Sequence, residues 1–320
     1  PTPTPLPSEQ PMSMPPHPDT LASALYGLEK MEYRHFTVIP RTPVIGGVIE
    51  GGDFENMTDD FAEDLRDALW KFGVLFGLGR NLSFDAMKNV SLIFGDRLEE
   101  HSFAPTLKEQ GHPEVTVIER SKSDGENKLD VDFWHHDVSA RTHPNIMSIL
   151  QADVVPFGAD TMWSSATAAY DLLPEGLNLL FETITVDHDT LYTLLRHNFG
   201  GGDITPEKIA MLQEKATHPA VIRHHATGAP CLFVANGYIK RVSGYDVDLS
   251  ELVIKLANQL PIIPELQVRH QWHPGDFAIW DNFATCHYGV SGHIGAQHRR
   301  LYRTAAWSES VNPEPFARPR

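Results

Sequence analysis

The chain has 320 residues, a formal net charge of −16 and two cysteines, Cys231 and Cys286. This length is enough to bury a large core, and the acidic balance argues against a nucleic-acid or anionic-membrane partner. Two cysteines do not make a disulfide framework, and no apolar run approaches the ~18 residues that a membrane span needs. The N-terminus also lacks the apolar region of a signal peptide, so we expect a soluble, cytoplasmic protein.

Residues 1–32 are rich in proline and contain few large apolar side chains before Leu21. This composition predicts a flexible N-terminal arm, because such a segment cannot bury enough apolar surface to order itself. The alternating pattern of a strand begins at Tyr33. We therefore expect one domain that covers residues 33–320.

Periodicity predicts short strands and two helices in the first half of the domain. One helix begins after the N-cap Thr58 and reaches about Lys71, and the other begins after Ser83 and reaches Phe94. The expected strands are 33–39, 44–49, 74–76, 115–119, 146–151 and a strand that starts at 161.

The second half has a cluster of helices followed by more strands. We expect helices at 164–173, 174–181 and 205–216, and one that Ser250 caps; the pattern of 184–195 fits either a helix or a strand. The expected strands are 221–225, 232–235, 268–272, 277–280 and 300–306. Many short strands with few βαβ units predict a mostly β fold, a sandwich or jelly roll, that carries helices.

A candidate metal site lies in the stretch Phe133-Trp134-His135-His136-Asp137-Val138. His135 and Asp137 are two positions apart in an expected strand, so their side chains point to the same face, whereas His136 points away. The bare pattern is more often the end of a surface strand, and a lone His287 downstream is more often a packed residue. Together, two histidines and one carboxylate that leave coordination positions open suit non-haem Fe(II) chemistry.

Two arginines near the C-terminus supply the other charged candidates. Arg299 and Arg303 are four positions apart on an expected strand, so both point into one cavity while Arg300 points away. A guanidinium binds a carboxylate as a bidentate fork, and two of them suggest two anionic groups to be held. The alternative is ordinary surface ion pairing in an acidic protein. Thr161 offers a hydroxyl to one of these anions.

These motifs together resemble the taurine dioxygenase family of Fe(II)- and 2-oxoglutarate-dependent oxygenases, from about Phe36 to Trp307. Several short segments carry the resemblance, in the family's order. They are Pro43-Val44-Ile45-Gly46, Phe94-Gly95-Asp96, Trp134-His135-His136-Asp137-Val138-Ser139, Gly158-Ala159-Asp160-Thr161-Met162-Trp163, Leu232-Phe233-Val234 with Gly237, Trp280-Asp281-Asn282 with His287, and Arg299 with Arg303.

The resemblance implies a double-stranded β-helix (jelly-roll) core with flanking and inserted helices. It implies Fe(II) bound by His135, Asp137 and His287, with 2-oxoglutarate and O2 as co-substrates. The distal carboxylate of 2-oxoglutarate is expected to bind Arg299 and Thr161. Arg303 is expected to face an anionic group of the substrate while lying close to 2-oxoglutarate. The products are succinate, CO2 and an oxidised substrate, and the assembly is a homodimer or homotetramer.

Departures from the family pattern concern the substrate. The family's Asn-Asp-Asn ahead of the Trp-His pair reads Val131-Asp132-Phe133 here, and His101 is one position out of register with a substrate-binding histidine. We expect a more apolar pocket for a small anionic substrate: a sulfonate, alkyl sulfate, aryloxyalkanoate or modified amino acid. The residues expected to line this pocket are Arg303, His101, Val131, Phe133, Val138, Phe199 and Tyr238. A metallohydrolase-like site and a non-catalytic organic-acid-binding protein are the alternatives.

Overall fold

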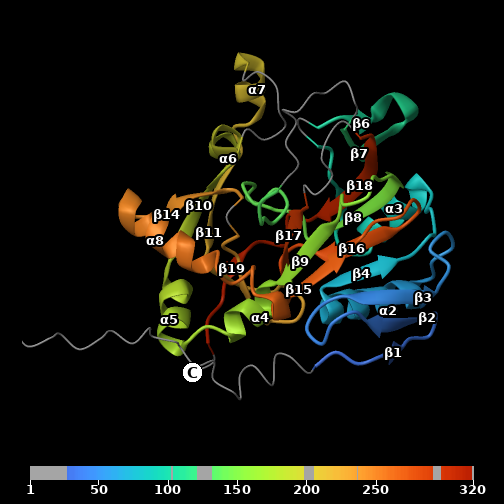
Figure 1. The fold of residues 1–320 in the computed structure, drawn as a ribbon, viewed down its shortest axis with the longest axis horizontal. Helices are drawn as coiled ribbons and strands as arrows, with labels where there is room; N and C mark the ends of the chain where they lie inside the picture. Colours follow the sequence, from blue (N-terminus) through green and yellow to red (C-terminus); the bar gives the residue numbers. More distant parts are fainter. Residues whose placement is uncertain are drawn as a thin grey trace, which may run out of the picture.

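The structure is a computed structural model that describes residues 27–101, 104–120, 132–197, 205–235, 237–290 and 297–318. Most of its regular secondary structure is β, with helices on the outside (Figure 1). The prediction of a mostly β fold with helices is therefore confirmed. Within the described ranges, no helix combines the length and the apolar character needed to cross a membrane.

The largest sheet has ten strands in the order β1-β2-β3-β4-β16-β8-β18-β7-β6, with β5 paired to β18. All of its pairings are antiparallel except that of β3 with β4. Its strands are β1 (Met31–Glu32), β2 (Phe36–Pro40), β3 (Gly47–Gly51), β4 (Val74–Gly77), β5 (Arg97–Leu98), β6 (Thr106–Leu107), β7 (His112–Arg120), β8 (Met147–Val154), β16 (Phe277–Asp281) and β18 (Arg299–Trp307).

Three smaller sheets have the orders β15-β9-β17, β11-β10-β14 and β13-β12-β19. Their strands are β9 (Thr161–Ser165), β10 (Thr185–Asp189), β11 (Lys215–Pro219), β12 (Val221–Arg223), β13 (Pro230–Leu232), β14 (Ile239–Val242), β15 (Gln267–His270), β17 (Thr285–Gly289) and β19 (Glu314–Pro315). The helices are α2 (Asp59–Phe72), α3 (Phe84–Leu92), α4 (Ala166–Asp171), α5 (Glu175–Thr183), α6 (Thr190–His197), α7 (Pro206–Met211) and α8 (Val247–Ala257), with short 3-10 turns at η1 (Lys108–Gln110) and η3 (Pro264–Leu266).

The central strands β4, β16 and β8 of the ten-stranded sheet are buried on both faces, and their side chains alternate between two cores. Leu75, Ile149 and Ile279 face helices α2 and α3. Their neighbours in the strands, such as Leu150 and Trp280, belong to a different cluster, which includes Trp163 of β9 in the small sheet β15-β9-β17. The large sheet thus lies between a helical layer and a second sheet.

Several local predictions hold. Thr58 and Ser83 cap α2 and α3 by accepting from the backbone N–H groups of Phe61 and Ala86. The ambiguous segment 184–195 forms a strand, β10, that passes directly into α6.

Other local predictions are wrong. Ser250 does not cap a helix, because Asp246 caps α8 through the Leu249 N–H, and the Ser250 hydroxyl lies inside α8 against the backbone of Val242. The helix expected at 205–216 ends at Met211, because Lys215–Pro219 pairs with β10 as strand β11. The boundary of the arm is also wrong: β1 pairs with β2, so the strand pattern begins before Tyr33. Residues 1–26 lie outside the described ranges.

Candidate metal centre

Three side chains from two distant parts of the chain converge at the edge of the small sheet β15-β9-β17. One ligand atom from each of His135, Asp137 and His287 lies within 4.8 Å of the other two, and all three residues are buried. His287 is on strand β17. His135 is not in a regular strand but forms an isolated bridge with His287, through backbone hydrogen bonds of 3.0 and 2.9 Å. The pairing of the two histidines is therefore set by the backbone.

The Nε2 atoms of the two imidazoles face the same oxygen of Asp137. The Nδ1–H of His135 donates to the carbonyl of Phe133 at 2.9 Å, which leaves Nε2 unprotonated and facing Asp137. The Nε2 atoms of His135 and His287 are 3.7 and 3.6 Å from Asp137 Oδ1. Burial lowers the pKa of both imidazoles, so both are neutral near pH 7. Two neutral nitrogens and a carboxylate oxygen are a ligand set for a divalent transition metal.

Asp137 is ionised and its second oxygen is already engaged. The Ser148 hydroxyl and the Arg303 guanidinium bind Oδ2 at 2.7 and 2.8 Å, which leaves Oδ1 toward the imidazoles. Burial alone would raise the pKa of Asp137, but the Arg303 guanidinium and the Ser148 hydroxyl outweigh it and hold the pKa well below its usual range. The carboxylate is therefore charged and has one oxygen pointing at the imidazole nitrogens.

The Trp280-Asp281-Asn282 motif supports the site without contributing to the cluster. Asp281 Oδ1 accepts from the N–H groups of Phe283 and Ala284, which closes the turn between β16 and β17. The Asn282 side chain accepts from the Asp137 N–H at 2.7 Å and donates to the Asp137 carbonyl at 3.0 Å. One residue thus fixes the backbone of Asp137 from both sides.

The backbone is strained directly after Asp137. Val138 is buried and has φ 45°, a left-handed conformation that a β-branched residue rarely adopts. Such a conformation costs on the order of 1–3 kcal/mol and is kept where the surroundings demand it. Val138 lies within a turn over residues 137–140. The strained residue is therefore part of the change of direction that takes the chain away from the site.

His136 faces away from the cluster, as expected. Its Nδ1 lies 2.8 Å from the carbonyl of Asn282, and its ring lies against Phe233. It is buried rather than exposed to solvent. Cys286, beside His287, is also buried, which raises the pKa of its thiol to about 12, so the thiol is protonated near pH 7.

A glycine allows a second segment to approach the cluster closely. The Gly237 N–H donates to the Trp134 carbonyl at 2.9 Å, and a Cβ at Gly237 would lie 2.6 Å from the Cβ of His135. This contact places Tyr238 beside the site, with its ring 6.3 Å from that of His135. Phe133 is buried with its ring 5.3 Å from the same imidazole.

Thr161 lies on the same side of the small sheet as His287. His287 pairs with Trp163, and Thr161 is two positions from Trp163 on β9, so the three side chains share one face. Thr161 is buried, and its Oγ1 accepts from the Trp272 indole N–H at 2.9 Å. Its own hydroxyl hydrogen is thereby directed away from Trp272. Sequence reasoning did not identify Trp272.

Arg303 and Arg299 lie on strand β18, which faces this sheet. The register of β18 with β7 is continuous from Arg299 to Arg303, so the two residues share a face with Leu301, which packs in the same cluster as Trp163. Arg300 points the other way, as the sequence predicted, and forms an ion pair with Asp153.

The sequence gives no local signal for the group behind Arg303. Glu99 is buried there, and its carboxylate accepts from Arg303, Arg141 and Asn145. Glu99, Arg303 and the segment that carries Arg141 and Asn145 are far apart in the chain, so no sequence spacing identifies their convergence. His101 is close enough to feel the charges of this group, and burial lowers its pKa to about 4. Val131 and Phe199, also expected to line a pocket, lie outside the described residues.

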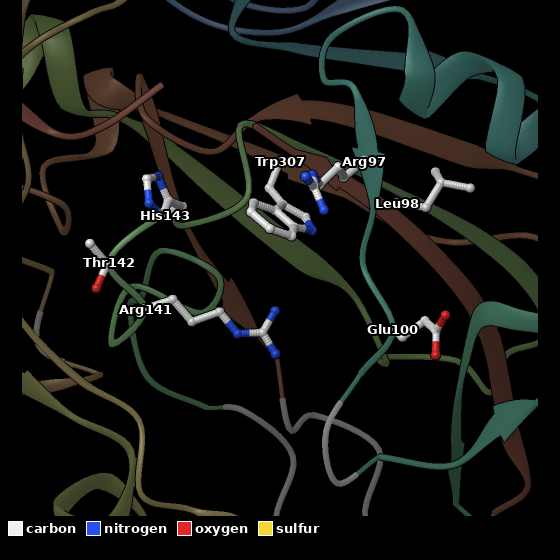
Figure 2. A pocket seen from close by; sticks show the side chains of 7 residues that line it. All are labelled: Arg97, Leu98, Glu100, Arg141, Thr142, His143 and Trp307. Atoms are coloured by element: carbon white, nitrogen blue, oxygen red, sulfur yellow. The ribbon is translucent and has the colours of Figure 1, made fainter. Parts of the chain in front are cut away.

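A cavity of about 530 Å³ is lined in part by Arg141 (Figure 2). Its lining contains none of the residues of the His135–Asp137–His287 cluster. The Arg141 side chain projects into it, and the guanidinium of Arg97 lies over the Trp307 ring at 5.4 Å. The residues that line it are Arg97, Leu98, Glu100, Arg141, Thr142, His143 and Trp307.

Comparisons with known proteins agree with this geometry. The model of a family described as "Taurine catabolism dioxygenase TauD, TfdA family" matches residues 37–305. An alkylsulfatase of Acinetobacter baylyi is 29% identical over 81% of this chain and 80% of its own length. An alpha-ketoglutarate-dependent sulfate ester dioxygenase of Pseudomonas putida is 32% identical over 67% of this chain and 74% of its own length.

A solved structure shares the fold. The crystal structure of a taurine dioxygenase from Burkholderia xenovorans superposes with a TM-score of 0.72 and 27% sequence identity. The match covers 89% of this chain and 93% of that one. The likeness therefore extends over nearly the whole of both molecules.

Proposed function

Since the chain belongs to the taurine catabolism dioxygenase TauD, TfdA family, we propose that it oxidises a C–H bond of a small anionic organic substrate. It is an Fe(II)- and 2-oxoglutarate-dependent dioxygenase, for which O2 is the oxidant. Bound iron would supply the oxidising chemistry, and 2-oxoglutarate would leave as succinate and CO2. The remaining question is what the residues of this chain do.

The observation that carries the proposal is the His135–Asp137–His287 cluster. These residues are the proposed metal ligands, through the two Nε2 atoms and Asp137 Oδ1. The donor set fits a ferrous ion, because three ligands on one side leave positions for a chelating acid and O2. The Phe133 carbonyl, Ser148 and Arg303 fix the ligands from behind, as is usual for ligands of protein-bound metals.

Thr161 and Arg299 are the proposed partners of the distal carboxylate of 2-oxoglutarate. Thr161 is supported by its place on the same sheet face as His287 and by Trp272, which orients its hydroxyl. Arg299 is supported by its place on the face of β18 that also carries Leu301 and Arg303. A guanidinium and a hydroxyl on facing strands are suited to one carboxylate.

The proposed substrate combines an anionic group with an apolar body. Sulfate esters are the class named for two of the relatives, and a sulfonate, an aryloxyalkanoate or a modified amino acid fits the same description. Phe133, Val138 and Tyr238 are the proposed apolar lining, because each is buried and adjoins a proposed metal ligand. His101 and Arg303 are the proposed polar contacts. Arg303 has five N–H groups, and Asp137 and Glu99 each accept from one of them.

We extend the proposal to the architecture. The small sheet β15-β9-β17 and the central strands of the large sheet would form the two faces of a double-stranded β-helix, within a single domain. This is supported by the buried cluster between the two sheets. The proposed assembly is a homodimer or homotetramer, which sedimentation analysis of the purified chain tests.

The experiment is a succinate-release assay on purified protein supplied with Fe(II), 2-oxoglutarate and ascorbate. The substrate panel would contain alkyl sulfates, alkyl sulfonates and aryloxyacetates, with the corresponding alcohols as uncharged controls. We expect anionic members to raise succinate release above the substrate-free rate. An Asp137→Ala variant should lose both this activity and the weak visible absorption that Fe(II) and 2-oxoglutarate give without oxygen. Metal-loaded wild-type protein that shows neither signal contradicts the proposal.

A further inference from the structure

The buried carboxylate of Glu99 is held by three donors. Its Oε2 accepts from Arg303 Nη2 at 2.6 Å and from Asn145 Nδ2 at 2.9 Å, and its Oε1 accepts from Arg141 Nη1 at 3.0 Å. Glu99 is only 2% exposed. The two arginines lower its pKa despite its burial, so it is charged.

Arg303 bridges this carboxylate to the proposed metal ligand. Nη2 binds Glu99, and Nη1 binds Asp137 Oδ2 at 2.8 Å. A guanidinium is planar, so fixing one of its amino groups on Glu99 also fixes the direction of the other. Together with the Ser148 hydroxyl, which also binds Oδ2, Arg303 holds the Asp137 carboxylate, and Glu99 fixes the direction of the guanidinium that does so.

The charges of Asp137, Arg303 and Glu99 also indicate that Glu99 supports the metal centre. A buried cation that touches Asp137 would by itself weaken the attraction of that carboxylate for a divalent ion. Glu99 adds a negative charge on the far side of Arg303 and offsets this effect. Orientation and charge both depend on the same residue, although Glu99 does not touch the metal cluster.

We propose that Glu99 is a positioning residue for the metal centre: by binding Arg303, it directs Asp137 Oδ1 toward the metal and balances the charge of Arg303. The inference rests on the proposed role of Asp137 as a metal ligand. Glu99, on the segment after β5, is then a second carboxylate that supports the metal centre, and it acts through the Arg303 guanidinium.

The test is a titration of metal-free protein with Co(II), followed by visible absorption, which requires no substrate, 2-oxoglutarate or turnover. In Glu99→Gln the side chain keeps its shape but loses its charge. We expect Co(II) to bind at least about tenfold more weakly, in line with other losses of groups behind metal ligands. The Co(II) spectrum should also change, because the angle of the carboxylate ligand is no longer fixed.

Glu214→Gln is the matched control, because Glu214 binds Arg141 at 2.8 Å on the side away from Glu99. It removes the same charge one residue farther from Arg303, and its Co(II) affinity should stay within about twofold of wild type. Equal affinities and spectra for wild type and both variants overturn the inference. Equal losses in both variants also overturn it, because the effect would then be one of net charge.

Asn145→Ala is the second test variant, to be used if Glu99→Gln does not fold. It removes one donor to Glu99 and leaves every charge in place, so a smaller loss of Co(II) affinity, about threefold, is expected, and an unchanged affinity overturns the inference. Failure of the wild-type protein to bind Co(II) would instead refute the metal site itself. The two failures are therefore distinguishable.

Discussion

The close approach of Gly237 to the metal centre gives a sharp prediction for Gly237→Ala. The added Cβ would lie 2.5 Å from Phe133 Cε2 and 2.6 Å from His135 Cβ. The φ angle of Gly237 is outside the left-handed region, so alanine is compatible with the backbone and only the contact is at issue. The hydrogen bond from Gly237 N–H to the Trp134 carbonyl keeps the two segments together.

The size of the effect follows from these contacts. An ordinary contact needs about 3.4 Å, so His135 and Gly237 must move apart by roughly 0.8 Å. Overpacking of this kind typically costs about 1–3 kcal/mol in the free energy of unfolding. Because a functional group must stay within about 0.5 Å of its working position, we expect metal affinity to fall at least tenfold as well.

The assay combines urea unfolding with Co(II) titration, and Gly176→Ala is the control. Gly176 lies in helix α5, where a Cβ would meet nothing within 4 Å. That variant should be stabilised slightly, by up to about 1 kcal/mol, since alanine favours the helix, and its Co(II) affinity should not change. If Gly237→Ala binds Co(II) as tightly as wild type, His135 does not occupy the position that we assign to it.

The remaining predictions concern the proposed co-substrate site, the charge beside the metal ligands and the buried histidines. Thr161→Val should weaken 2-oxoglutarate binding about tenfold, because it loses a hydrogen bond to a charged group, and the KM for 2-oxoglutarate measures this; an unchanged KM removes Thr161 from that site. Arg303→Met should cost about 3–5 kcal/mol in urea unfolding, since it removes the buried cation that pairs with both Asp137 and Glu99, and a neutral result would contradict the burial of these ion pairs. Burial holds the pKa of His188 well below the ordinary histidine value of about 6.5, so the unfolded chain takes up the proton first. The free energy of unfolding should therefore fall as the pH drops below about 6.5, and His188→Gln should show a shallower decline in denaturant unfolding.

Local sequence signals correctly predicted the helices that are defined by interactions between residues close together in the chain. The caps Thr58 and Ser83 act within three residues, and the apolar period of α2 is set by residues on one helix face. The same reasoning failed at Ser250, because Asp246 offers an equally good cap four residues earlier and only packing against Val242 decides between them. It also failed at Lys215–Pro219, where pairing with β10 outweighs helix propensity.

The candidate site also has features that the sequence predicted and features that depend on tertiary packing. The sequence alone determined which residue types are available and in what order: a His and an Asp two apart, a later His287, and a pair of arginines on one strand. Those features are local patterns, or follow from a resemblance that extends over most of the chain.

Only the tertiary structure decided how these residues meet. The bridge between His135 and His287, the clamp of Asn282 on Asp137 and the link from Asp137 through Arg303 to Glu99 all join residues more than 140 positions apart. Such contacts have no period or spacing in the sequence, because their positions depend on how whole sheets pack. Glu99 therefore carries no mark in the sequence, although the structure places its charge directly behind the residue that holds Asp137.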